Sequence, residues 1–198
     1  MKLSRITKAV AALAGAAALT LGVVLPAHAV TQVSSGHADV VAINSGNSVG
    51  SKIGSTFNYW SGGTPLFDHE FVYNKPIGKT GVSCTGSGGV LWIPDGVSGL
   101  PSVGLDNASA NSYQISVSKV SGSSGTGGVT LDTPLSGSVS TGGASETIGS
   151  GGHEHGNWVF TLGSCGLNQT HTFTLKFTAK NTSTNVSTNK NIKFIINT

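Results

Sequence analysis

Positive charge is scarce in this chain of 198 residues, and three of its eleven basic residues are Lys2, Arg5 and Lys8. Beyond them the sequence has no arginine and holds eight lysines against eight acidic residues, so the formal net charge of +3 falls to zero. A neutral region without arginine does not form the basic face that binds nucleic acid. We therefore expect no nucleic-acid partner.

The motifs of several large enzyme classes are missing. The segment Gly78-Lys79-Thr80 matches the end of a P-loop, but the first glycine of that motif would fall at Tyr73. No G-x-S-x-G nucleophile elbow is present, and the few carboxylates are too scattered to assign a glycosidase pair. The sequence therefore predicts a protein that is not an enzyme.

Long hydrophobic runs are limited to the N-terminus. Residues 9–25 are apolar apart from glycine and threonine, and the A-x-A pattern at 27–29 follows them. A basic start, an apolar run and a small-residue cleavage site are typical of a signal peptide. A retained anchor is the alternative. We expect a signal peptide over 1–29 and one mature domain over 30–198 that has no membrane span and is secreted or loosely associated with the cell wall.

Cysteine is limited to Cys84 and Cys165. In an exported chain such a pair favours one disulfide, which would close a loop of about 80 residues and contribute roughly 4 kcal/mol in the chain-entropy model. Two thiolate metal ligands are the alternative. Export favours the oxidised pair, so the sequence predicts a disulfide bond.

Apolar and polar residues alternate with a period of two in several mature segments, which is typical of half-buried strands. The segments are 67–74, 113–118, 172–179 and 192–196, and shorter apolar runs lie at 40–43, 90–93 and 158–162. Glycine is abundant, with 29 residues, and punctuates the regions between these segments. This pattern predicts an all-β fold, an antiparallel immunoglobulin-like β-sandwich of about eight to ten strands.

His153 and His155 stand two residues apart at the start of a predicted strand. In an extended chain residues i and i+2 point to the same side, so both imidazoles can face one metal ion while Glu154 faces away. His37 and Asp39 form a similar pair near the mature N-terminus. We predict that His37, His153 and His155 bind a divalent metal ion.

The remaining histidines have other interpretations. His171 fits an ordinary imidazole at a strand start, whereas His69 lies between Asp68 and Glu70, which could serve a cation. The fourth ligand is left open between Asp39, His69, Glu70 and water. Three imidazoles suit zinc, copper or nickel; zinc is favoured by tetrahedral preference and availability outside the cell, and copper is the alternative.

Three segments carry a resemblance to a known family. They are GHADV at 36–40, VLWIP at 90–94 and GHEHGNWVFT at 152–161. These segments resemble the actinobacterial surface-anchored protein domain, also called the choice-of-anchor M domain, over roughly residues 36–180. The late block is the specific part. The chain departs from the family pattern at Glu154 and Gly156, which stand where alanines are usual.

The resemblance implies an extracellular β-domain, and the family's association with metal ABC transporters implies a role in metal handling with such a transporter or another cell-surface protein as partner. By motif match the ligand positions carry over to His37, His153 and His155, with Asp39, Asn157 and Trp158 as neighbours. The sequence thus favours a metal-binding protein that captures or delivers an ion. The alternatives are a structural or adhesive wall module stapled by its histidine cluster and, ranked last, a zinc hydrolase.

Overall fold

A computed structural model of the protein describes residues 30–61, 68–74, 83–85, 89–120, 127–133, 137–162 and 168–198. Within these ranges the chain forms sixteen strands and no helix, so the prediction of an all-β fold is confirmed. The described residues accordingly offer no helix that could cross a membrane. The predicted signal peptide lies outside them.

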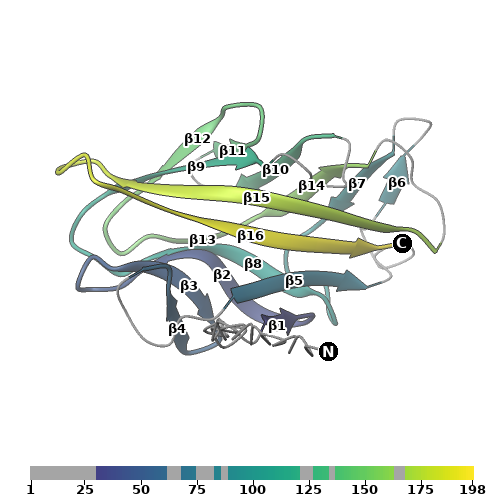
Figure 1. The fold of residues 1–198 in the computed structure, drawn as a ribbon, viewed down its shortest axis with the longest axis horizontal. Helices are drawn as coiled ribbons and strands as arrows, with labels where there is room; N and C mark the ends of the chain where they lie inside the picture. The colour runs from purple at the N-terminus through teal and green to yellow at the C-terminus, as the bar shows by residue number, and fades with distance from the viewer. Residues whose placement is uncertain are drawn as a thin grey trace, which may run out of the picture.

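The strands form three sheets (Figure 1). The six-stranded sheet has the spatial order β1 (Val30–Val33), β5 (Asp68–Asn74), β16 (Ser187–Asn197), β15 (Thr170–Asn181), β9 (Tyr113–Lys119) and β12 (Ser145–Ile148). One five-stranded sheet has the order β11 (Gly137–Ser140), β10 (Val129–Thr133), β14 (Asn157–Thr161), β7 (Val90–Ile93) and β6 (Ser83–Thr85). The other has the order β13 (His153–His155), β8 (Pro101–Asn107), β2 (Gly36–Ile43), β3 (Val49–Ile53) and β4 (Thr56–Tyr59).

Most neighbouring strands are antiparallel, as predicted, but three pairings are parallel: β1 with β5, β5 with β16, and β2 with β8. The predicted number of strands, eight to ten, is too low. The missed strands are mostly three to five residues long and lie among glycine and serine turns. Such short segments show too few alternations to be recognised from sequence.

Alternation predicted the buried face correctly where a strand is long. In β15 the side chains of Phe173, Leu175 and Phe177 are buried, and in β9 those of Ile115 and Val117 are buried. The apolar run at 90–93 is different, because Trp92 is 38% exposed between buried neighbours. That run therefore alternates between buried and exposed side chains like the other strands.

An aromatic cluster joins the six-stranded sheet to the sheet that contains β14. The ring of Phe194 on β16 lies 4.9 Å from that of Trp158 and 5.9 Å from that of Phe160, both on β14. Trp158 also donates a buried hydrogen bond from Nε1 to the carbonyl oxygen of Val103 on β8, at 2.9 Å. All three sheets therefore meet at one core, which fixes their relative positions.

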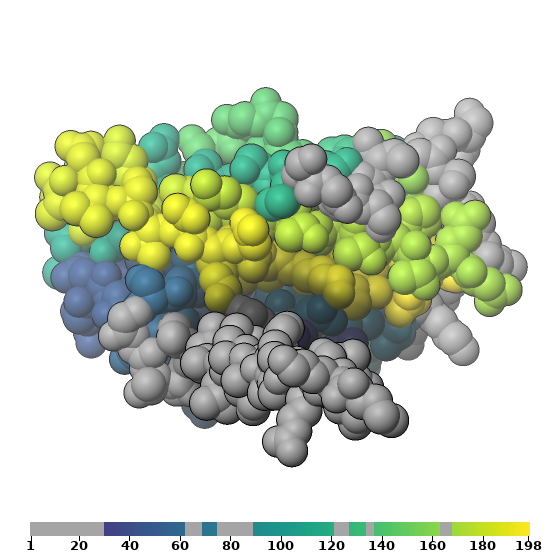
Figure 2. Space-filling model, viewed as in Figure 1, coloured from purple at the N-terminus to yellow at the C-terminus, as the bar shows by residue number. Residues whose placement is uncertain are grey.

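The β15–β16 hairpin runs the length of the molecule, with β2, β3 and β8 below it in the view and β9 to β12 above it (Figure 1). It forms a continuous band across this face of the molecule (Figure 2). Eleven residue pairs link the two strands, from Thr170 opposite Asn197 to Lys180 opposite Ser187. The hairpin contains the two longest strands among the described residues, and β9 and β5 pair along its two outer edges.

Candidate metal centre

Three adjacent strands of one sheet bring the predicted ligands together. The strand β8 lies between β13, which carries His153 and His155, and β2, which carries His37 and Asp39. In register, His155 and Asp39 both lie opposite Gly104 on β8. The outer strands are two strand spacings apart, roughly 10 Å, so their side chains must reach over β8 to meet.

Gly104 makes that meeting possible. A Cβ atom added at this position would lie 2.8 Å from two carbons of the His155 ring and 2.3 Å from the backbone oxygen of Glu154. Any side chain here would occupy the space through which the imidazole crosses β8. The strand β2 is also irregular beside the site, since its register with both neighbours shifts after Asp39. Such bulges reorient side chains locally.

The three imidazoles converge through the same ring nitrogen. The Nε2 atom of His155 lies 2.9 Å from that of His37 and 3.2 Å from that of His153, and the third separation is 3.1 Å. Each neutral imidazole has one N–H and one lone pair, so hydrogen bonds alone cannot satisfy three nitrogens that all face one another. A single cation bound by the three Nε2 lone pairs would satisfy all three nitrogens.

Asp39 provides the fourth donor atom at the base of the cluster. Its Oδ1 lies 3.2 Å from Nε2 of His153 and 3.5 Å from Nε2 of His155. The side chain is fully buried, and neither oxygen makes a hydrogen bond of acceptable geometry. Lys52, opposite Asp39 on β3, donates from its ammonium to Asp106 at 2.7 Å and acts on Asp39 only through its charge. A buried carboxylate left in this state needs a positive charge beside it.

The cluster is open to solvent on the opposite side. The side chains of His37 and His153 are 43% and 46% exposed, whereas that of His155 is 12% exposed. An ion could therefore approach between His37 and His153 and reach Asp39 below. Donor atoms of the four residues all lie within 4.8 Å of one another, so the group could hold a metal ion.

The surroundings shift the pKa values of two histidines in opposite directions. Burial lowers the pKa of His37, an effect that Asp39 opposes and the other two imidazoles reinforce. Burial also acts to lower the pKa of His155, but the contact with Asp39 and the charges of further carboxylates outweigh it and raise that pKa. As pH falls, His155 therefore takes up a proton before His37 does.

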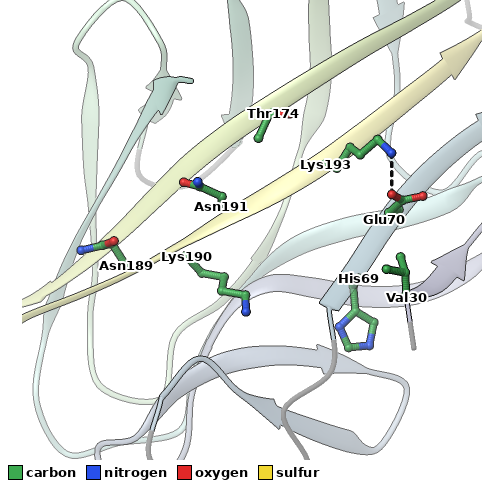
Figure 3. A pocket seen from close by; sticks show the side chains of 8 residues that line it. All are labelled: Val30, His69, Glu70, Thr174, Asn189, Lys190, Asn191 and Lys193. Carbon is green, nitrogen blue, oxygen red and sulfur yellow. Dashed lines mark hydrogen bonds and ion pairs between the residues drawn. The ribbon is translucent and has the colours of Figure 1, made fainter. Parts of the chain in front are cut away.

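The alternatives for the fourth ligand lie elsewhere. His69 and Glu70 are on β5 in the six-stranded sheet, and Glu70 accepts a hydrogen bond from Lys193 at 2.6 Å. Figure 3 shows this pair and His69 lining a pocket whose labelled residues include no further histidine. His171 lies apart from the cluster, with Nε2 3.2 Å from Oε1 of Gln169. Asp39 is thus the protein donor that the fold places beside the histidines.

Other sequence predictions have mixed outcomes. Glu154 is buried on the opposite face of β13 from the histidines, as predicted. Cys165 and the side chain of Cys84 lie outside the described residues, so the disulfide stays a prediction. Gly104 is not among the site residues predicted from the sequence. A glycine inside the strand-like run at 101–107 was the available signal, because such a glycine often marks a close approach.

Comparison with known proteins gives no further help. No protein-family model, no curated protein and no solved structure matches this chain. The resemblance described above stays a prediction, and the functional argument rests on the residues of the cluster.

Proposed function

We propose that this protein is an exported metal-binding protein that takes up one divalent transition-metal ion, with zinc favoured and copper as the alternative, at His37, Asp39, His153 and His155. One observation carries the proposal. A buried carboxylate without a hydrogen bond lies beside three imidazoles that all present the same nitrogen. Metal coordination satisfies the lone pairs and the charge of all four groups together.

The ligand separations support zinc. A tetrahedral zinc ion with bonds of about 2.0–2.2 Å requires ligand atoms about 3.3–3.6 Å apart. Five of the six separations between the donor atoms range from 2.9 to 3.5 Å, close to this requirement after slight expansion. The sixth, between His37 and Asp39, is longer but lies within the 4.8 Å that spans the group. Three imidazoles and one carboxylate also give a borderline ligand set that suits zinc and copper better than calcium or magnesium.

The topology favours reversible capture. The strands β2, β8 and β13 are joined by backbone pairing, so ligands from distant parts of the chain are brought together by the sheet itself. The partly exposed side chains of His37 and His153 leave the site accessible to solvent. Four protein ligands also fill the position that a catalytic zinc site reserves for water, which supports a binding protein over a hydrolase.

The sequence supports the proposed compartment and partner. The signal-like N-terminus and the resemblance to the choice-of-anchor M family support a secreted or loosely wall-associated protein that hands its ion to a metal ABC transporter or another surface protein. The same resemblance supports an immunoglobulin-like β-sandwich as the finer description of this all-β fold. A neutral mature chain is consistent with a protein partner and not with nucleic acid.

The primary test is elemental analysis of protein purified without a histidine tag, followed by calorimetry with zinc and copper. We expect one equivalent of metal and one tight site. Wild-type protein that shows no tight binding for either ion would overturn the proposal.

The wall-module alternative has one supporting observation: β13 is a three-residue edge strand, which a metal bridge to β2 would fasten. Chelation distinguishes the two. A capture protein stays folded when the ion is removed and loses only the stability that metal binding adds. A module held together by the metal no longer shows cooperative thermal unfolding once the ion is removed. Circular dichroism melts with and without chelator provide the comparison.

A further inference from the structure

The second ring nitrogen of His155 has its own partner. Its Nδ1 lies 2.9 Å from Oγ of Ser102 on β8, and the same Oγ donates a hydrogen bond to Oδ1 of Asp95 at 2.5 Å. A hydroxyl has one hydrogen, and the carboxylate can only accept. The Ser102 hydrogen therefore goes to Asp95, and Ser102 must accept from His155. This arrangement places the proton of His155 on Nδ1 and leaves the lone pair of Nε2 facing the cluster.

Further hydrogen bonds position the segments that carry Asp95 and Ser102. Asn157 accepts a hydrogen bond from the backbone nitrogen of Asp95 at 3.3 Å through its Oδ1. On the other side, Trp158 holds the carbonyl of Val103, the residue between Ser102 and Gly104, at 2.9 Å. Asn157 and Trp158, which follow His155 after Gly156, thus help to position Asp95 and Ser102 behind the His155 ring.

We propose that Ser102 and Asp95 are positioning residues that select the Nδ1–H tautomer of His155 and so preset its Nε2 for metal. This inference rests on the proposed metal-binding function. The Asp95 carboxylate, acting through the Ser102 hydroxyl, also increases the electron density of the imidazole. Groups behind a metal-binding histidine commonly contribute 10- to 100-fold in metal affinity in this way.

The test uses full-length mature protein and two measurements. Long-range ¹H–¹⁵N spectra of the metal-free protein report the tautomer of His155, and titration against a competing chelator reports the dissociation constant for zinc. We expect the Nδ1–H tautomer in wild type. Ser102→Ala should lose this preference and bind zinc roughly 10- to 100-fold more weakly. Asp95→Ala should show a smaller loss in the same direction.

Two further variants make the result specific. Ser118→Ala removes an exposed hydroxyl from β9 in another sheet and should leave both measurements unchanged. Ser102→Thr keeps the hydroxyl and should restore the tautomer and most of the affinity. Backbone amide spectra confirm that each variant is folded, and the exposed position of Asp95 makes its substitution the safer one if Ser102→Ala unfolds.

The two proposals fail in distinguishable ways. If wild-type protein has the Nδ1–H tautomer of His155 but does not bind zinc, the proposed metal-binding function is wrong and the hydrogen bonding around Ser102 is still supported. Tight zinc binding with equal affinity in wild type, Ser102→Ala and Asp95→Ala would overturn the positioning role alone. An Nε2–H tautomer in metal-free wild type would overturn it as well.

Discussion

Two short polar triplets in this chain look alike in sequence but differ in their surroundings. His153-Glu154-His155 forms β13, and Asp68-His69-Glu70 begins β5. Each offers ligand-type side chains at alternating positions of a strand. The first faces His37 and Asp39 across Gly104 in a five-stranded sheet, whereas the second lies in the six-stranded sheet beside β16.

The difference lies in what the neighbouring strands supply. Beside β13, the chain provides a glycine without a side chain and then two more donors. Beside β5, it provides Lys193, whose ammonium pairs with the Glu70 carboxylate and neutralises it. A triplet of ligand-type residues forms a candidate metal centre only when neighbouring strands add donor side chains on the same face and leave space between them.

Removing a histidine from the cluster should have the largest effect. Structural zinc sites bind with about 10–16 kcal/mol, so one of four ligands is worth on the order of 100-fold or more in affinity. We expect His153→Ala and His155→Ala to abolish tight zinc binding in calorimetry. His37→Ala should do the same. His69→Ala and His171→Ala are matched controls that should bind like wild type. Equal binding by all five variants would contradict the comparison between the two triplets.

Replacing Asp39 with asparagine should separate binding from stability. The substitution keeps the shape of the side chain and removes the charge, so zinc affinity should fall by about 10- to 100-fold. The metal-free variant should be more stable than wild type by about 1 kcal/mol, because an amide costs less to bury than a carboxylate that accepts no hydrogen bond. Denaturant melts in the presence of chelator measure this. A clear loss of metal-free stability would count against an unsatisfied carboxylate at this position.

Gly104→Ala should close the space over β8. The new methyl group would meet the His155 ring and the Glu154 backbone, and we expect about 1–3 kcal/mol of destabilisation from the forced shift. Zinc affinity should fall by roughly tenfold because His155 moves. Gly149→Ala is the matched control, since its Cβ would meet nothing within 4 Å. The prediction is wrong if both variants behave alike.

Binding should weaken on mild acidification. Metal requires neutral imidazole, and the raised pKa of His155 means that its proton begins to compete above the ordinary value of 6.5. His37, with its lowered pKa, stays neutral further into the acid range. We therefore expect the apparent affinity for zinc to fall by about tenfold from pH 7.5 to 6.5 and more steeply below. Affinity that stays constant down to pH 6 would contradict protonation of His155 in this range.

The smallest effect should come from the other triplet. Glu70→Gln removes a partly exposed ion pair with Lys193, which is worth no more than about 1 kcal/mol. Zinc affinity should not change. A weaker zinc site in this variant would show that β5 belongs to the metal centre after all, and would remove the distinction between the two triplets.

The fold class and part of the site can be predicted from local features of the sequence. Alternation in β9 and β15 is a local property of the chain, because a pleated strand with one buried face requires it. The common direction of His153 and His155 is likewise set by the covalent geometry of two residues in an extended chain. Both features could be predicted without knowing any neighbour.

The neighbours of these two histidines depend on the tertiary structure. Asp39 rather than Glu70 lies beside them because β8 pairs with both β2 and β13, and the His155 ring has room over β8 because residue 104 is a glycine. These pairings link residues at least 47 positions apart in the sequence. Which strands pair depends on how the three sheets bury one shared core. The free energy of that burial depends on many residues together, so no local pattern in the sequence reveals it.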